Sequence, residues 1–196
     1  ALGSNVPANE MLVIPQGDRP TVFQHPTQMI IGGPTKSGKT TLLLKLLRQR
    51  NQMFSHPFEK IYWFYKLENS IRAARQEFPE INFVDGHVGK NFVDDLDIDT
   101  HKLLIMDDMQ EMVSKPKTLE PLLNIFTRDS HHRNLTVIFL VQDLFLKNMN
   151  LVARQCENVI VMINGSSVTN IQNMGRRSMG NKISGFIDWA CKKVKA

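Results

Sequence analysis

The stretch "GGPTKSGKTTLLLKLL", residues 32–47, limits the possible folds of this chain more than any other. It fits the pattern Gly-x-x-x-x-Gly-Lys-Ser/Thr, a loop whose backbone N–H groups surround phosphates. The apolar residues 29–31 before it predict a buried strand, and the leucines in 41–47 predict a helix. A strand, a glycine loop and a helix N-terminus together form an anion site, because the helix dipole adds partial positive charge there. The chain is therefore predicted to bind a nucleoside triphosphate.

Two side chains of this loop have expected chemical roles. Lys39 would reach the β- and γ-phosphates, and the Thr40 hydroxyl would ligate Mg²⁺. The alternative is a glycine turn that carries an incidental lysine, and the flanking strand and helix patterns disfavour it. The residues expected to contact the nucleotide are Gly33, Pro34, Thr35, Lys36, Ser37, Gly38, Lys39, Thr40 and Thr41.

The segment "LLIMDD" predicts the acidic half of the same site. An apolar strand that ends in carboxylates places them at the C-terminal edge of a parallel sheet, beside the phosphate loop. Asp107 is the expected Mg²⁺ ligand, and Asp108 the expected catalytic group that orients or deprotonates water. Glu111 is a second candidate for the base, although it lies three residues further on. Two solvated turn aspartates remain the alternative to both roles.

Two further catalytic candidates flank another apolar run, "LTVIFLVQD" at 135–143. Gln142 near its end can hydrogen-bond the γ-phosphate and the attacking water, or it can simply cap a turn. Arg133 stands just before the run and could reach the nucleotide of a neighbouring subunit if subunits form a ring. Arg128 and Arg154 are alternative fingers, and any of the three can be a surface charge.

The remaining pattern predicts an α/β fold with a mostly parallel central sheet and helices on both faces. Hydrophobic content of 42% and a length of 196 residues suit one domain with a full core. Residues 1–22 are expected to form an irregular arm that starts with a stretch typical of a cloning remnant, 23–164 the P-loop core, and 165–196 a C-terminal loop and helix. Further strands are expected at 60–67, 81–86, 101–110 and 158–164, and helices at 70–78 and 118–134, the latter capped by Thr118 and breaking near Ser130. An acidic helix or loop is expected at 90–99.

Charge and cysteine content restrict the function classes. The net charge of +5 is compatible with a polyanionic partner. Cys156 and Cys191 have no metal-type spacing, so a structural disulfide is not expected and a reducing compartment is. No apolar run approaches the ~20 residues of a membrane span, and no signal peptide is evident. We therefore expect a protein that is neither secreted nor embedded in a membrane.

Three segments, "FQHPTQMIIGGPTKSGKTTLLLKLL", "LLIMDDM" and "FTRDSHHRNLTVIFLVQDLF", resemble the packaging ATPases of Polinton/Maverick virus-like elements and their viral relatives. These belong to the FtsK–HerA superfamily, which includes the poxvirus-type packaging ATPases. The resemblance covers about residues 23–164. It implies ATP and Mg²⁺ as cofactors, with Asp107 and Asp108 as the acidic pair, Gln142 as the sensor and Arg133 as the arginine before the sensor strand. It also implies that the Gln142 strand lies between the phosphate-loop strand and the Asp107 strand.

The resemblance further implies a homo-oligomeric ring, a pentamer or hexamer, that moves double-stranded DNA into a procapsid inside the host cell, in the cytoplasm or nucleus. At the second acid this chain has Asp108, where many relatives have glutamate. Because the aspartate side chain is shorter, the assignment of the base is less secure. The residues themselves, rather than the resemblance, make Arg176, Arg177 and Lys182 candidate DNA contacts in the tail, together with the lysines of "CKKVK", and a solvated tail that never meets DNA is the alternative for either cluster. Two other functions fit the phosphate loop: a small-molecule or nucleoside kinase, and a slow nucleotide-gated switch.

Overall fold

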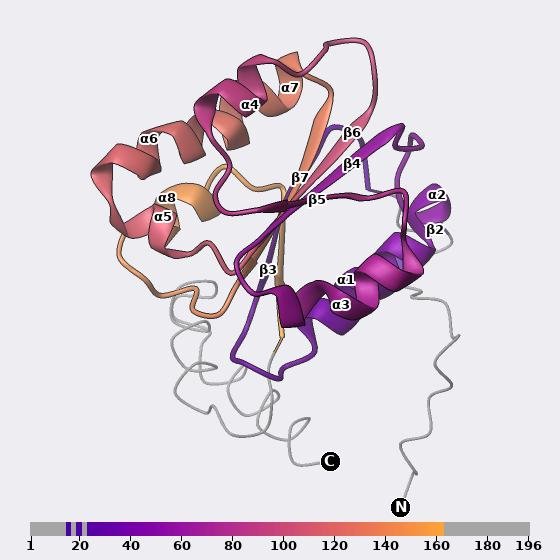
Figure 1. Cartoon of the computed structure of the whole chain (residues 1–196), viewed down its shortest axis with the longest axis horizontal. Helices are drawn as coiled ribbons and strands as arrows, with labels where there is room; N and C mark the ends of the chain where they lie inside the picture. The colour runs from indigo at the N-terminus through magenta and orange to yellow at the C-terminus, as the bar shows by residue number, and fades with distance from the viewer. Residues whose placement is uncertain (1–14, 17–18, 21–22, 163–196) are drawn as a thin grey trace, which may run out of the picture.

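A six-stranded parallel sheet forms the centre of the protein (Figure 1). The computed structural model describes residues 15–16, 19–20 and 23–162. Its strand order is β5-β4-β6-β7-β3-β8, and every neighbouring pair is parallel. The fold prediction is confirmed. The strands are β3 (Gln28–Gly32), β4 (Lys60–Tyr65), β5 (Asn82–Asp85), β6 (Lys102–Asp107), β7 (Leu135–Val141) and β8 (Asn158–Val161).

Helices cover both faces of this sheet (Figure 1). One face carries α1 (Lys39–Arg48), α2 (Arg50–Met53) and α3 (Glu68–Glu77). The other carries α4 (Lys90–Asp94), α5 (Glu111–Ser114), α6 (Pro116–Asn124), the π-helical turn η1 (Ile125–Asp129), α7 (Ser130–His132) and α8 (Met149–Ala153). Among the described helices, none is long and apolar enough to cross a bilayer.

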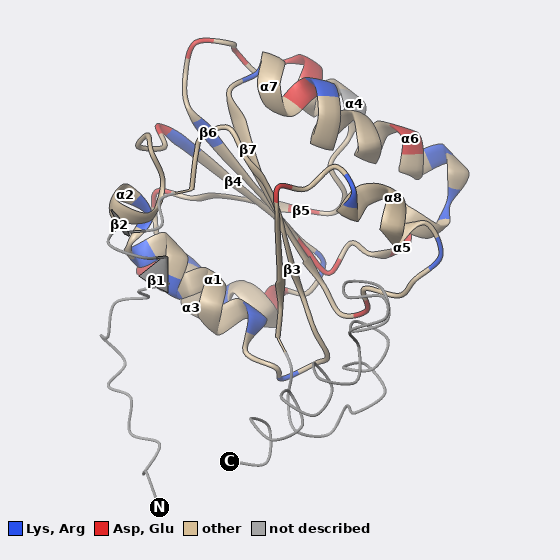
Figure 2. Ribbon diagram, turned by 180° about the vertical axis from the view of Figure 1, so that it is seen from behind, with Lys and Arg blue, Asp and Glu red and all other residues tan. Residues whose placement is uncertain are grey.

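The strands are buried on both sides, which explains their continuous apolar runs. Leu103 and Ile105 pack toward α1 and α3, whereas Leu104 and Met106 pack toward the opposite helices. All seven residues of β7 are buried. Figure 2 shows that charged residues lie on helices, loops and strand ends, so the sheet holds two apolar cores and keeps its polar groups at its edges.

The segment predicted as a helix over 118–134, with a break near Ser130, differs in detail. It begins at Pro116. Proline is tolerated at the first helical position because a backbone N–H there would have no partner within the helix. The segment then passes through η1 into α7. The predicted Thr118 cap is wrong, because the Thr118 hydroxyl lies inside the first turn and donates to the carbonyl of Met112 at 2.8 Å. The short helices α5 and α8 were not predicted, since four or five residues carry too little periodicity.

The N-terminal arm includes a two-residue antiparallel pair, β1 (Pro15–Gln16) and β2 (Arg19–Pro20). The acidic segment 90–99 contains α4 and then a loop. The predicted tail, with Arg176, Arg177, Lys182 and Cys191, lies outside the described residues. β7 lies between β3 and β6, as the resemblance implied, and this order brings the ends of three site strands together.

Candidate nucleotide-binding site

The phosphate loop joins the end of β3 to the start of α1. Its Gly33 N–H donates to the carbonyl of Val141 at 3.1 Å, which fixes the loop to the end of β7. A Cβ on Gly33 would lie 2.4 Å from the carbonyl oxygen of Met162, so this close approach of two backbones requires glycine. Gly38 has a φ of 95°, a left-handed conformation that turns the chain into α1. The strand, loop and helix prediction is confirmed.

Lys39, the first residue of α1, folds back over the loop. Its Nζ donates to the carbonyls of Gly33 at 2.7 Å and Pro34 at 3.0 Å. Burial lowers the pKa of Lys39, and the carboxylates of Asp107 and Asp108 oppose that shift. The ammonium group lies inside the loop, where phosphate oxygens can replace these carbonyls as acceptors.

The two aspartates lie at the C-terminal end of β6, close enough to Lys39 to interact with it electrostatically. Asp107 ends the strand and is only 8% exposed, and Asp108 has a φ of 57°. This left-handed turn lets consecutive side chains line one cavity. Burial raises the pKa of Asp107 to about 6, with the Asp108 carboxylate adding to the shift, while Ser70 and Lys39 act against it. A cation beside this buried carboxyl would stabilise its charged form, and the charged form is the one that binds Mg²⁺.

The raised pKa of Asp107 predicts a specific pH dependence of folding. Because the folded-state pKa lies above the unfolded value, folding takes up a proton at this carboxyl, and the contribution of Asp107 to the free energy of unfolding falls as pH rises from about 4 to about 6. Asp107→Asn should remove this slope and raise the free energy of unfolding at pH 7.5 by about 2 to 3 kcal/mol without nucleotide. Urea unfolding at pH 5 and 7.5 measures both effects. A variant with the wild-type slope would contradict the assignment.

Gln142 connects the phosphate loop to the second acid. Its Nε2 donates to Asp108 Oδ1 at 2.8 Å, and its Oε1 accepts from the Thr35 hydroxyl at 3.3 Å. The backbone N–H of Gln142 donates to Gln110 Oε1 at 2.9 Å. One amide therefore contacts both the loop and the candidate base, an arrangement that can register whether a γ-phosphate is present.

These side chains surround one cavity of about 180 Å³. Seven of the residues predicted from the sequence line it. Three further residues also line it: Leu67 and Ser70 at the start of α3, and Leu140 in β7. The predicted residues that line it are Thr35, Lys36, Lys39, Thr40, Asp107, Asp108 and Gln142.

Glu111, the alternative base, does not line the cavity. It is paired with Lys66, and its Oε1 lies 3.0 Å from His87 Nε2. Both partners come from segments far from Glu111 in the sequence. These contacts occupy its carboxylate, so the geometry favours Asp108 for the water-directing role.

The three candidate arginines lie away from the chain's own phosphate loop. Arg133 precedes β7, at the edge of the sheet opposite to the loop, and its Nη1 donates to the carbonyl of Leu96 at 2.5 Å. Arg128 is paired with Asp129 at 2.9 Å. Arg154 is exposed, and its side chain has no ion pair within the described part of the chain. None of them completes the cavity in cis.

Two supporting residues were missed by sequence reasoning. Gln110 accepts from the N–H groups of Gln142 and Asp143, at 2.9 and 3.3 Å, and holds the end of β7 next to β6. Ser70 donates to Asp107 Oδ2 at 3.4 Å. A single glutamine after an acidic pair and a single serine in a helix carry no distinctive spacing, and only the fold brings them to the site.

Comparison with known proteins finds no matching family model and no matching curated protein. Among solved structures, the chain is similar to the cytoplasmic domain of EssC, with a TM-score of 0.53 and 14% identity over 69% of this chain and 31% of the other. It is also similar to ATPases 2 and 3 of EssC from Geobacillus thermodenitrificans, with a TM-score of 0.51 and 14% identity over 72% of this chain and 33% of that one. This chain thus spans about a third of each EssC structure.

A third similar structure matches over most of both chains. The genome packaging NTPase B204 from Sulfolobus turreted icosahedral virus 2, in complex with ATP-gammaS, aligns with 87% of this chain and 87% of its own, at a TM-score of 0.50 and 16% identity. Identities this low establish the fold alone. The fold is that of a P-loop NTPase.

Proposed function

We propose that this protein is an ATPase that moves double-stranded DNA, in the manner of a packaging motor that fills a procapsid. The observation that carries the ATPase part is the Gln142 amide, which hydrogen-bonds both Thr35 of the phosphate loop and Asp108. A protein that only held a nucleotide would not need a polar link between the loop and a candidate base. The DNA part is supported by the sequence resemblance and by the packaging NTPase among the similar folds.

Each residue of the cavity has a defined role in this proposal. Thr40 and Asp107 would hold Mg²⁺, which supplies positive charge to the phosphate oxygens. Lys39 exchanges its loop carbonyls for the β- and γ-phosphates. Asp108 accepts a hydrogen bond from the attacking water, and Gln142 moves its Nε2 from Asp108 to the γ-phosphate. Releasing Asp108 from this amide when phosphate is bound would couple hydrolysis to nucleotide occupancy.

The proposed DNA coupling predicts a stimulated ATPase. Double-stranded DNA should raise the rate of phosphate release from Mg²⁺–ATP several-fold, and Asp108→Asn should remove both the basal and the stimulated rates. Phosphate release with and without DNA, across a salt series, measures this. Transfer of phosphate to a small acceptor would instead support the kinase, and slow hydrolysis that DNA leaves unchanged would support the switch.

A ring with shared active sites predicts complementation between two inactive variants. In this proposal Arg133 acts in trans, through guanidinium N–H groups other than the one bound to Leu96. Arg133→Ala subunits keep the phosphate loop and Asp108, so mixing them with Asp108→Asn subunits should restore part of the activity. Turnover per subunit should also rise with protein concentration. If the mixture stays inactive while Arg154→Ala subunits are rescued by Asp108→Asn, the finger is Arg154.

A further inference from the structure

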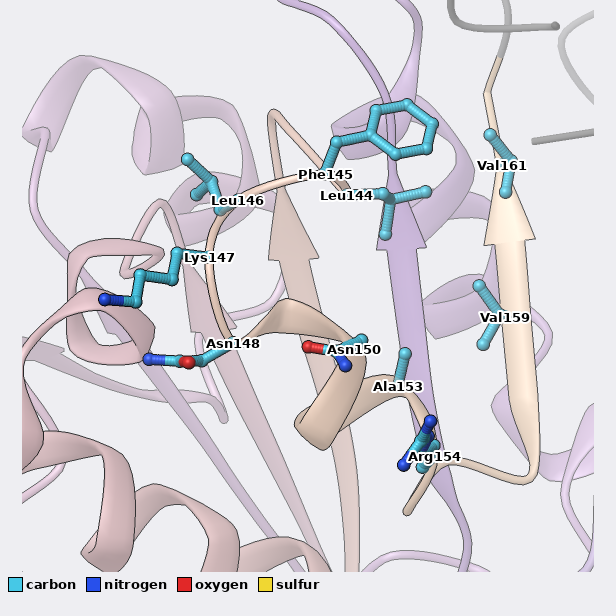
Figure 3. A pocket seen from close by; sticks show the side chains of 10 residues that line it. All are labelled: Leu144, Phe145, Leu146, Lys147, Asn148, Asn150, Ala153, Arg154, Val159 and Val161. Carbon is cyan, nitrogen blue, oxygen red and sulfur yellow. The ribbon is translucent and has the colours of Figure 1, made fainter. Parts of the chain in front are cut away.

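A groove lies beside the edge strand β8, and it shares no lining residue with the nucleotide cavity (Figure 3). It has a volume of about 690 Å³ and lies between this strand, α8 and the loop after β7. Its walls are largely apolar, and Val159 in β8 is 46% exposed. The lining residues are Leu144, Phe145, Leu146, Lys147, Asn148, Asn150, Ala153, Arg154, Val159 and Val161.

The charged residues that line this groove, among those the structure describes, are both basic. Lys147 and Arg154 are both exposed, and neither forms an ion pair within the described part of the chain. Among the residues that the structure describes, no aspartate or glutamate lines the groove. Figure 3 shows the two valines on β8, Arg154 at the end of α8, and Lys147 on the loop after β7, on the side of α8 away from the valines. The groove therefore suits an apolar side chain that is flanked by carboxylates.

The same chain exposes such a group at another place. In the loop between α4 and β6, Ile98 is 57% exposed, and Asp95 and Asp99 near it are exposed as well. Figure 2 shows this loop at the top of the molecule with acidic residues along it. We refer to residues 95–99 as the acidic tip. Leu67, at 61%, is the more exposed of the two most exposed large apolar residues in the described part of the chain, and Ile98 is the other.

The acidic tip is held in place by its own chain. Asn134 Nδ2 donates to the carbonyl of Ile98 at 2.7 Å, and Arg133 Nη1 donates to that of Leu96 at 2.5 Å. The Thr100 N–H donates to Asp97 Oδ1 at 2.9 Å. A tip fixed before contact loses less conformational entropy on binding, which favours its use as a contact surface.

We propose that the groove beside β8 receives the acidic tip of a second copy of this chain, with Ile98 against the valines and Asp95 and Asp99 near Lys147 and Arg154. An apolar floor does not suit a phosphate backbone, which binds through charge and polar groups. The complementary group is present on this chain itself, which favours a second copy over a foreign partner. Because this contact joins neighbouring subunits of the proposed translocating ring, the inference rests on the proposed function.

The two surfaces do not overlap. The acidic tip lies over the N-terminal ends of β4, β6 and β7, where Asp97 pairs with Lys60 at 2.8 Å, whereas the groove runs along β8 at the end of the strand order. Each copy therefore offers a groove to one neighbour and a tip to another. Such a head-to-tail contact closes into a ring when the rotation between copies permits, and otherwise continues as a filament.

Charge reversal and its rescue test this contact. The mass of the full chain is measured by sedimentation over a concentration series with Mg²⁺ and a non-hydrolysable ATP analogue. Lys147→Glu with Arg154→Glu should weaken self-association about tenfold or more, and so should Asp95→Lys with Asp99→Lys. Combining all four changes should restore much of the association, because the signs match again. Lys115→Glu with Lys117→Glu, an exposed pair outside both surfaces, is the control and should have little effect.

Several results would overturn the inference. These are a wild-type chain that stays monomeric throughout, reversals that leave its mass unchanged, a fourfold variant that stays as weak as its parents, and groove reversals that lower only affinity for DNA. Circular dichroism of each variant shows that it folds. DNA-stimulated phosphate release by the wild-type chain tests the proposed motor separately, so a stimulated ATPase that assembles through other residues would refute this contact alone.

Discussion

Lys39→Ala should lose most of its affinity for Mg²⁺–ATP and nearly all of its hydrolysis. The lysine lines the cavity and folds back over the loop, with its Nζ 2.7 Å from the carbonyl of Gly33. Removing a charge-assisted contact to phosphate should weaken binding by about 1.5 to 3 kcal/mol, or roughly ten- to a hundredfold in Kd. Titration with a fluorescent ATP analogue measures the affinity, and phosphate release measures the turnover.

The fold should tolerate this substitution. Lys39 is only half-buried, and its removal leaves no apolar cavity, so the melting temperature without nucleotide should change by only a few degrees. Lys45→Ala, on the same helix but outside the cavity, is the matched control and should bind ATP as the wild type does. Hydrolysis near the wild-type rate in Lys39→Ala would refute the assignment of the nucleotide site.

Asp108→Asn should separate binding from chemistry. Asparagine keeps an oxygen that can accept the 2.8 Å hydrogen bond from Gln142, so the cavity should keep its shape and its affinity for ATP. It cannot take a proton or orient water as a carboxylate does, and losing a positioned base costs about 10² to 10⁴ in rate. Single-turnover hydrolysis beside an equilibrium binding titration measures the two effects independently.

Glu111→Gln is the matched control for this experiment. The Glu111 carboxylate is paired with Lys66 and His87 and does not line the cavity, so the substitution should leave the rate of hydrolysis within a few-fold of wild type. It should instead lower thermal stability slightly, since these pairs are lost. If Glu111→Gln bound ATP normally but did not hydrolyse it, while Asp108→Asn stayed active, the two roles would be reversed.

The sequence alone determined the local parts of the site. A glycine loop between an apolar run and a leucine-rich helix predicts an anion site because the spacing itself places the N–H groups and Lys39. The same holds for Asp107 and Asp108, since an apolar run that ends in acids predicts a strand with carboxylates at its C-terminal edge. These predictions depend on residues within a few positions of each other, and the short-range periodicity of helix and strand fixes them.

The tertiary structure decided which of these parts meet. The hydrogen bond from Gln142 to Asp108 joins residues 34 positions apart, and it forms because β7 pairs with β6. The periodicity of one strand does not specify its neighbour, so only the resemblance had implied this order. Long-range packing likewise turned Glu111 toward Lys66 and His87 and tied Arg133 to Leu96. Such contacts depend on how distant segments pack, and no local pattern encodes them.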